Sequence, residues 1–374
     1  MKYYIIAGEA SGDLHGANLI KHLKDSDTEA DFRCWGGDKM KAQGATIVKH
    51  VNDLSFMGFW EVLINLPAIL KSIRFCKKDI LSYKPNALIL IDYPGFNLSM
   101  AKFAKKNNIK TIYYISPQLW AWKQSRIKTV KRYVDKMLVI LPFEKIFYNK
   151  FNYDVEFTGH PLIDAIESEK KKLISKENFI KKNNLPDKPI IAILPGSRKI
   201  EISKMLKIMA QIVKFFPDYQ FVIAGISSLM PSFYEKFTKK TNVTIIYDQT
   251  YQILHSASAA IVASGTATLE TALIKTPQVV CYKAGMISYH IAKKIVKVKY
   301  ISLVNLVMDR IVVKELIQND FNPNYLKDEL YRLLTDEQYR NEMLEAYNKL
   351  ENKLGGAGAS KNAANIIYNY LKEE

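Results

Sequence analysis

Cysteine is scarce in this chain of 374 residues, and its histidines are scattered. The three cysteines, Cys34, Cys76 and Cys281, show no C-x-x-C motif and no paired spacing. Their arrangement argues against a disulfide framework and favours a reducing compartment. The six histidines form no H-x-x-x-H motif and have no carboxylate partner at ligand spacing, so we expect no metal and no other cofactor.

Long apolar runs are missing as well. No stretch approaches the ~20 residues that span a bilayer, and the first apolar run ends at Gly8, so we expect neither a membrane span nor a signal peptide. Acidic residues are outnumbered, with 37 Asp and Glu against 54 Lys and Arg and a net charge of +17. This charge favours an anionic partner, which can be nucleic acid, a membrane face or a phosphorylated substrate. We expect a cytoplasmic protein that can still contact a membrane.

Short apolar runs alternate with helical patterns along the whole chain. This alternation predicts parallel sheets covered by helices, and the length suits about two domains of roughly 150 residues each. Strands are expected at 3–7, 87–91, 111–115 and 137–140 in the first half, and at 190–194, 221–225, 243–247, 259–264 and 278–282 in the second.

A charged stretch that ends in two prolines, 167–189, is the expected junction between the domains. We therefore predict a first domain at 1–166, a second at 190–345 and a helical segment at 346–374. Doubly wound sheets bind ligands at the carboxyl ends of their strands, so a cleft between the two halves is the expected site.

The stretch "YYIIAGEASGDLHGANLI" (3–20) reads as a strand, a glycine-rich turn and a helix. Its glycines recur at spacing four, which excludes the dinucleotide loop, the P-loop and the hydrolase elbow. One interpretation is a helix N-terminus that faces an anion or a hydroxyl-rich ligand, with Glu9 and Ser11 beside it. The alternative is that Ser11 or Asp13 only caps the helix and the glycines permit a tight turn.

Two strand ends in the second half suit a nucleotide. The N–H groups at 265–268 in "ASGTATLE" would bind a diphosphate, and Arg198 in "LPGSR" could reach the same phosphates. Glu270 could accept hydrogen bonds from ribose hydroxyls, although a first-turn carboxylate can also serve only the helix dipole.

Two segments of the first half carry further candidates. Asp92 ends a buried strand in "IDYPGFN", where desolvation would raise its pKa toward that of a useful base; alternatively it caps a turn. Trp120 and Trp122 precede the basic stretch 123–136, which suits single-stranded nucleic acid or phosphorylated lipid, or is a solvated face behind core tryptophans.

The most apolar helical stretch is 54–75. A core helix is the usual explanation for such a stretch. Its few polar residues also suit an acyl-binding or membrane-facing surface. The apolar residues that would contribute to it are Phe56, Met57, Phe59, Trp60, Leu63, Leu66 and Leu70.

Taken together, nine segments resemble the lipid-A-disaccharide synthase family, whose members act in bacterial outer-membrane biogenesis. The resemblance covers nearly the whole chain and rests, in order, on "AGEASGDLHGANLI", "MGFWEVL", "IDYPGFN", "YYISPQLWAWKQSRIK", "LPFEK", "GHPLID", "LPGSR", "ASGTATLE" and "SLVNL".

The resemblance implies a GT-B fold of two Rossmann-like doubly wound domains, with C-terminal helices that can return to the first domain. It implies transfer with inversion from UDP-2,3-diacylglucosamine to 2,3-diacylglucosamine 1-phosphate, which gives a β-1,6-linked disaccharide and UDP without metal. The implied setting is the inner leaflet of the cytoplasmic membrane of a Gram-negative bacterium, as a peripheral protein without nucleic acid. A homodimer with exchanged C-terminal segments is left open.

The resemblance also implies site residues. The catalytic set is Asp92, Arg198, Glu9 and Ser11. Some family members carry a second aspartate where this chain has Gly95, which leaves the base open and makes Asp92 the nearest candidate. The substrate-binding set is Gly12, Asp13, Asn97, Trp120, Ser197, Ser264, Gly265, Thr266, Thr268, Glu270 and Asn305.

Two rival functions remain for comparison. Another GT-B transferase or epimerase acting on a UDP-sugar would share the diphosphate helix, but it does not explain "AGEASGD" together with "SPQLWAW". A non-catalytic basic module that binds RNA or membranes needs only outer charge, so the polar groups at several strand ends argue against it.

Overall fold

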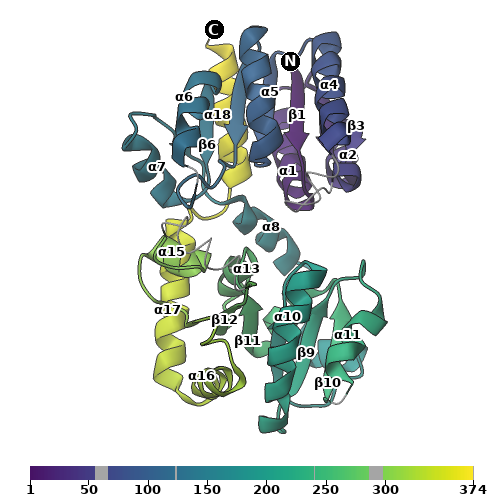
Figure 1. Ribbon diagram of the computed structural model, residues 1–374, viewed down its shortest axis with the longest axis vertical. Coiled ribbons are helices and arrows are strands. Elements are labelled where there is room, and N and C mark those ends of the chain that lie inside the picture. The colour runs from purple at the N-terminus through teal and green to yellow at the C-terminus, as the bar shows by residue number, and fades with distance from the viewer. Residues whose placement is uncertain (55–65, 123, 240, 286–297, 374) are drawn as a thin grey trace. The chain divides into compact units, whose positions relative to one another are not determined.

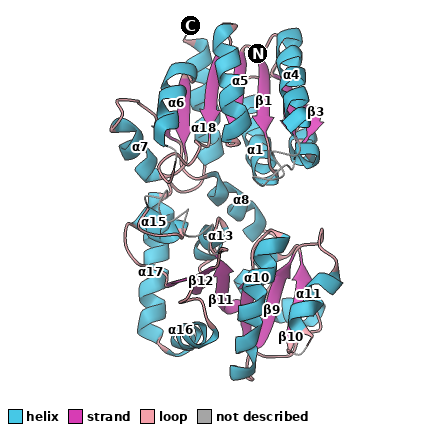
Figure 2. Cartoon of the chain, viewed as in Figure 1, coloured by secondary structure: helices cyan, strands magenta, loops and turns pink. Residues whose placement is uncertain are grey.

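The structure is a computed structural model that describes residues 1–54, 66–122, 124–239, 241–285 and 298–373 (Figure 1). The chain divides into two compact units: Met1–Pro161 with Leu354–Glu374, and Leu162–Lys353. Each unit is a parallel sheet with helices on both faces (Figure 2). The first boundary lies before the segment 167–189 that the sequence suggested as the junction. That segment includes the end of helix α8 (Pro161–Lys170) and helix α9 (Lys176–Lys182).

The first unit has a seven-stranded sheet in the order β3-β2-β1-β4-β5-β6-β7, and all its strand pairs are parallel. In this order the strand sequence runs outward on one side of β1 and continues from β4 on the other side, so β1 and β4 lie side by side at the switch point of the sheet. Folds of this kind bind ligands at the switch point. The strands are β1 (Lys2–Ala7), β2 (Asp31–Gly36), β3 (Thr46–His50), β4 (Ala87–Ile91), β5 (Lys110–Tyr114), β6 (Lys136–Val139) and β7 (Glu156–Phe157).

Strand β1 shows why its sequence is apolar without alternation. Tyr4 and Ile6 pack into the core on one face of the sheet, while Tyr3, Ile5 and Ala7 pack into the core on the other. A strand buried on both faces needs apolar residues at every position. The covering helices are α1 (Ala10–Ser26), α2 (Asp38–Ala42), α4 (Leu66–Tyr83), α5 (Pro94–Lys106), α6 (Ile127–Tyr133), α7 (Pro142–Asn149) and α18 (Ala359–Lys372).

The C-terminal helix α18 belongs to this first unit. Its buried residues Ala363, Ala364 and Ile367 join the core formed by α1 and β1. Small side chains at 363 and 364 allow this helix to pack closely against its neighbours. The expectation that the C-terminal helices can return to the first domain is therefore met within one chain.

The second unit has a six-stranded parallel sheet in the order β10-β9-β8-β11-β12-β13. Its strands are β8 (Ile190–Leu194), β9 (Gln220–Gly225), β10 (Val243–Tyr247), β11 (Ala257–Ala263), β12 (Gln278–Tyr282) and β13 (Glu315–Ile317). Besides α8 and α9, its helices are α10 (Lys199–Met209), α11 (Pro231–Thr238), α12 (Thr250–Ser256), α13 (Ala267–Leu273), α15 (Leu303–Met308), α16 (Pro323–Thr335) and α17 (Glu337–Lys353).

All nine expected strands are confirmed, four of them with the expected bounds and the rest within two residues at each end. Strands β2, β3, β7 and β13 were not expected. Among the described residues, no helix is both long enough and apolar enough to cross a bilayer. The prediction for 54–75 falls partly on 55–65, which lies outside the described residues; Leu66 onward forms α4.

Candidate active site

A cavity of about 300 Å³ lies at the carboxyl ends of β8 and β11 in the second unit. Because both strands are parallel and adjacent, the loops that follow them share one edge of the sheet. Pro195, Gly196 and Ser197 line the cavity from the first loop, and Ser264, Gly265 and Thr266 line it from the second. Glu270, one turn into α13, completes the wall.

The first of these loops requires a glycine. Gly196 has a φ of +115°, and a Cβ built at this position would lie 2.4 Å from the Glu201 carboxyl carbon. Glu201, in the first turn of α10, accepts a hydrogen bond of 3.2 Å from the Ser197 N–H. Arg198 is exposed at the N-cap of α10, and the residues that line the cavity do not include it.

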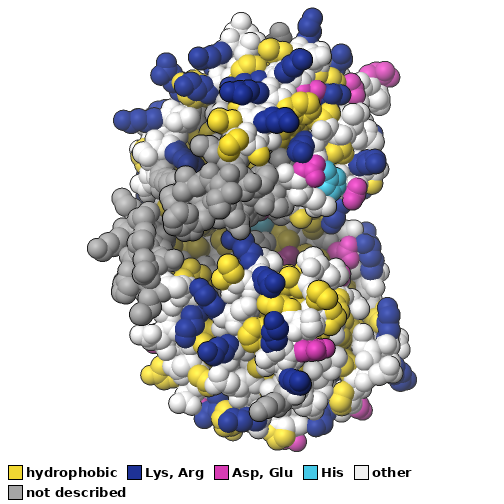
Figure 3. All heavy atoms as spheres, turned by 45° about the vertical axis from the view of Figure 1, so that its right-hand side comes forward, with side chains coloured by type: hydrophobic (Ala, Val, Ile, Leu, Met, Phe, Trp, Pro, Cys, Tyr) yellow, Lys and Arg dark blue, Asp and Glu magenta, His cyan; other side chains and the backbone are white. Residues whose placement is uncertain are grey.

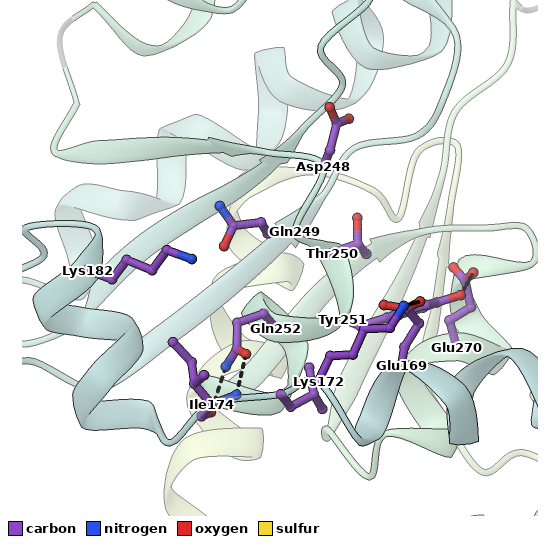
Figure 4. Close-up of a pocket in the computed structure, with 11 residues that line it drawn as sticks. Glu169, Lys172, Ile174, Lys182, Asp248, Gln249, Thr250, Tyr251, Gln252 and Glu270 are labelled. Atoms are coloured by element: carbon purple, nitrogen blue, oxygen red, sulfur yellow. Dashed lines mark hydrogen bonds and ion pairs between the residues drawn. The ribbon is translucent and has the colours of Figure 1, made fainter.

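A second pocket of about 430 Å³ shares Thr250 and Glu270 with the first. Figure 4 shows Tyr251 and Glu270 beside each other, with Glu169 at the end of α8 and Lys172 just after that helix near them. Tyr251 Oη donates a hydrogen bond of 2.9 Å to the Glu270 carboxylate. Burial raises the pKa of Glu270, and the Tyr251 hydroxyl acts in the opposite direction.

The remaining predicted residues of this unit use their polar atoms within the protein. Thr268 Oγ1 donates to the Gly265 carbonyl at 2.8 Å, which closes the first turn of α13. Ser264 Oγ donates to the Ile301 carbonyl at 3.0 Å. Asn305 is fully buried, and its amide bonds to the main chain of Val312 and Val313. These contacts give Asn305 a clear role in holding the fold.

In the first unit, the loops after β1 and β4 lie side by side because these strands pair directly. Asp92, which follows β4, has its pKa raised to about 6 by burial and by the nearby Glu9 carboxylate. Asp92 and Tyr93 both adopt the left-handed region, with φ values of 44° and 48°. Such backbone costs of order 1–3 kcal/mol per residue and is found at functional sites.

Three hydrogen bonds from two side chains, Asn97 and Tyr113, hold the main chain at Asp92 in place. Asn97 is fully buried and donates from Nδ2 to the Asp92 carbonyl at 2.8 Å and to the Ile91 carbonyl at 3.2 Å. The Tyr113 hydroxyl also donates to the Asp92 carbonyl, at 2.5 Å. The main chain at Asp92 is therefore fixed from two elements, α5 and β5. Gly95 is exposed, with open space at the position of a Cβ.

The glycine-rich turn is explained by close internal packing. A Cβ on Gly8 would lie 2.4 Å from Tyr93 Cγ, and a Cβ on Gly12 would lie 3.0 Å from the Ala7 Cβ. Asp13 is buried and accepts from the Gly37 and Met40 N–H groups at 2.7 and 3.1 Å, so it caps α2.

The N-terminus of α1 has a different surrounding. Its N-cap residue, Glu9, makes no capping bond through its side chain. Ser11, in the first turn, is exposed. The first N–H groups of this helix are thus not covered by the side chain of the N-cap residue.

Trp120 and the residues around it form a further buried group at the same edge of the first sheet. Trp120 is nearly buried and packs edge-on against Phe143 at 4.9 Å between ring centroids. Nearby, Ser116 Oγ donates to the buried carboxylate of Glu144, which also accepts the Leu141 N–H at 2.9 Å. Burial raises the pKa of Glu144 to about 7, and these hydrogen bonds limit the rise.

The structure thus groups the predicted residues by unit. Glu9 and Ser11, at the start of α1, and Asp92, after β4, follow neighbouring strands of the first sheet. Ser197, Ser264, Gly265, Thr266 and Glu270 lie around one cavity of the second unit. The sequence patterns missed Tyr251, Glu144 and Glu315, which act through contacts with residues distant in the chain. They also missed Glu201, which bonds to Ser197 four residues before it. Within the described ranges, no three His, Cys, Asp or Glu side chains are placed to hold a metal ion.

Two Rossmann-like units with this sheet order are the GT-B architecture. The UDP-GlcNAc 2-epimerase from Neisseria meningitidis bound to UDP-GlcNAc matches all of both chains, with a TM-score of 0.70 and 16% identity. CalG4, the calicheamicin glycosyltransferase, matches 100% of this chain and 98% of its own with a TM-score of 0.62 and 15% identity. These similarities establish the class of fold.

The particular family follows from sequence. The model of the lipid-A-disaccharide synthetase family matches residues 3–367. A protein of Trichlorobacter lovleyi described as lipid-A-disaccharide synthase is 36% identical to this chain, over 99% of this chain and 97% of its own length. The protein of the same description from Syntrophus aciditrophicus is 38% identical, over 99% of this chain and 97% of its own length. The chain belongs to the lipid-A-disaccharide synthase family and is a glycosyltransferase.

Proposed function

We propose that this chain transfers 2,3-diacylglucosamine from its UDP ester to the 6-hydroxyl of 2,3-diacylglucosamine 1-phosphate, with inversion at the anomeric carbon. The observation that carries the proposal is the match to this family along nearly the whole chain. Direct displacement converts an α-linked UDP ester into a β-glycoside in one step. The products are the disaccharide 1-phosphate and UDP.

The second unit binds the nucleotide in this proposal. The cavity between Gly196 and Thr266 offers main-chain N–H groups to the diphosphate. Ser264 forms part of its wall, and Thr268 fixes the Gly265 carbonyl beside it. Glu270 faces the adjoining pocket, where its carboxylate can accept hydrogen bonds from the ribose hydroxyls. Arg198, exposed beside the same loop, stabilises the charge that develops on the departing UDP.

The first unit supplies the base and holds the acceptor. Asp92 has a pKa of about 6, so it is ionised at neutral pH and is a stronger base than an ordinary aspartate. It takes the proton from the attacking 6-hydroxyl. Glu9 and Ser11, at the exposed start of α1, hydrogen-bond the sugars, and Asn97, Asp13 and Gly12 fix the loops that carry them.

Acylated substrates place this reaction at a membrane surface. Helix α4 exposes Leu70 and Phe75 beside Lys71 and Arg74. Figure 3 shows Lys and Arg side chains spread over the visible face of both units, with fewer acidic side chains among them. Apolar insertion combined with positive charge supports peripheral binding to the anionic inner leaflet of the cytoplasmic membrane of a Gram-negative bacterium. A homodimer is compatible with this arrangement.

The direct test is mass spectrometry of the products formed by the purified protein from the two diacyl sugars. A disaccharide 1-phosphate and UDP in equal amounts, formed equally with and without EDTA, are expected. Release of a UDP-free monosaccharide or of an epimerised UDP-sugar would contradict the proposal. Strict dependence on a divalent ion would contradict the metal-independent part.

A further inference from the structure

A hydrogen-bond network in the second unit joins β13 to the segment that precedes α15. Its centre is Glu315, the first residue of β13. The Glu315 carboxylate accepts the N–H groups of Ile301 and Ser302 at 3.1 and 2.9 Å, and Asn305 Nδ2 at 2.9 Å. Convergence of three donors is the arrangement expected for an ionised carboxylate, whose hydrogen bonds are stronger than those of a neutral acceptor.

The same network is closed by Asn305, which is fully buried. Its Oδ1 accepts the N–H groups of Val312 and Val313 at 2.8 and 3.0 Å, and its Nδ2 donates to the Val313 carbonyl at 2.9 Å. The segment at 301–305 is therefore fixed to the segment at 312–315 through side chains. Glu315 contributes the bonds to Ile301, Ser302 and Asn305, and Asn305 contributes those to Val312 and Val313.

The network reaches the nucleotide cavity through one peptide group. The carbonyl of Ile301 accepts the hydrogen bond of 3.0 Å from Ser264 Oγ, and the Ser302 N–H of the same peptide group donates to Glu315 at 2.9 Å. Ser264 lines the cavity together with Gly265 and Thr266. A displacement of the main chain at 301 would remove the partner that fixes the Ser264 side chain at the cavity wall.

We propose that Glu315 is a positioning residue for nucleotide binding, which acts through Ile301 on the Ser264 wall of the cavity. This inference rests on the proposed function, because it assumes that the cavity binds UDP. A carboxylate is required for a chemical reason. Both oxygens of the carboxylate accept the Ile301 N–H, at 3.2 and 3.1 Å, so in either orientation of a glutamine the amide N–H groups would face that donor.

The test compares Glu315→Gln with Glu351→Gln in the full-length protein. Glu351 forms an ion pair with Lys275 in the same unit, away from the cavity, so its replacement also removes a partly buried charge contact. For Glu315→Gln, calorimetry is expected to show a Kd for UDP about tenfold higher, equivalent to about 1.4 kcal/mol. The KM for the UDP-sugar rises in parallel while kcat changes less. Glu351→Gln leaves both unchanged.

A double-mutant cycle with Ser264→Ala tests the route of the effect. If Glu315 acts through Ile301 and Ser264, the two replacements together raise the Kd by less than the product of their separate effects. Independent, fully multiplicative effects would overturn the inference. Ser264→Ala alone, which removes the hydroxyl that bonds to Ile301 from the cavity wall, is expected to weaken UDP binding severalfold, and an unchanged Kd would also overturn the inference.

The outcomes separate the inference from the function on which it rests. If the unaltered protein binds UDP and Glu315→Gln binds it equally well, the positioning role is wrong and the proposed function stands. If the unaltered protein does not bind UDP, the proposed function itself is wrong. If Glu315→Gln does not fold, Ser264→Ala alone decides.

Discussion

The phenol of Tyr251 donates a hydrogen bond of 2.9 Å to the carboxylate of Glu270, across 19 residues of sequence. The two residues lie on α12 and α13 and meet where the two pockets of the second unit adjoin. Burial alone would favour the protonated form of Glu270, and the hydroxyl counteracts it. The Tyr251 hydroxyl therefore limits the rise of the Glu270 pKa and favours the ionised carboxylate.

Removal of that hydroxyl gives the first prediction. In Tyr251→Phe, the pKa of Glu270 rises further, so UDP affinity falls roughly threefold to tenfold near neutral pH and falls more steeply as the pH is lowered. Calorimetric titration of UDP at several pH values measures this. Tyr247→Phe is the matched control, because the Tyr247 hydroxyl has no hydrogen-bond partner among the described residues. An equal loss of UDP affinity in Tyr251→Phe and Tyr247→Phe would contradict the role assigned to Tyr251.

The second prediction concerns the pH dependence of the reaction. A base must be deprotonated, so kcat/KM should rise with pH through the Asp92 pKa of about 6 and then level off. Asp92→Asn should lower kcat by roughly 10²–10⁴-fold. Glu9→Gln removes a neighbouring negative charge, so it should move the rising limb to lower pH.

The control for that experiment is Glu144, whose pKa of about 7 also lies in the measured range. Glu144→Gln should leave the limb near pH 6 in place. If the limb disappears in Glu144→Gln and persists in Glu9→Gln without a shift, the titrating group is Glu144 and Asp92 is not the base.

Much of the fold could be read from the sequence because the strands of both sheets are buried on two faces. Runs such as 87–91 and 190–194 are apolar at every position, and their bounds were predicted correctly. Strand β2 was missed because its sequence, DFRCWG, mixes charged and apolar residues. Arg33 in that strand pairs with Asp79 of α4, a contact that no local pattern indicates.

The candidate site was predictable where its residues follow strands and not where they depend on distant contacts. Asp92 and the loops at 195–198 and 264–266 stand directly after apolar runs. Asp13 and Asn305 also looked like ligand-binding residues, and the structure gives both of them main-chain partners in other segments. A polar residue in a recognisable motif can thus serve the loop that binds a substrate, and only the fold separates the two roles.

The third prediction concerns Gly95, where some family members have a second aspartate. Position 95 is exposed in the first turn of α5, and a Cβ there meets no atom within 4 Å. Gly95→Asp should therefore raise the free energy of unfolding by about 0.5–1 kcal/mol, since aspartate favours a helix N-terminus. Urea denaturation measures the gain. Because Asp92 remains, we expect little change in kcat; a large increase would make position 95 the better place for the base.

The fourth prediction concerns the buried His160. Burial and the neighbouring His15 lower its pKa to about 3, whereas in the unfolded chain it titrates near the ordinary value of about 6.5. Between these values the unfolded state binds more protons, so the stability contributed by His160 falls by about 1.4 kcal/mol per unit as the pH decreases. His160→Gln should destabilise the protein less near pH 5 than near pH 7.5, as measured by urea denaturation on either side of the His pKa. If the difference in free energy of unfolding between the unaltered protein and His160→Gln is the same at both pH values, His160 is not held neutral.

The last prediction tests the membrane contact with residues that the structure describes. Leu70 and Phe75 of α4 are 44% and 46% exposed, so Leu70→Ser with Phe75→Ser should preserve the fold. Loss of two apolar side chains from the inserted surface should weaken binding to vesicles that contain anionic lipid by about tenfold or more.

Salt and a matched variant complete that test. Binding of the unaltered protein should weaken between about 0.1 M and about 1 M NaCl, because the Debye length falls from about 10 Å to about 3 Å and screens the lysines and arginines. Met230→Ser removes a side chain that is 74% exposed in the second unit, and it should bind vesicles normally. Flotation of vesicles measures the bound fraction, and circular dichroism confirms folding. If the folded double variant floats as well as the unaltered protein, the membrane contact lies outside the exposed face of α4, and peripheral binding must depend on another surface.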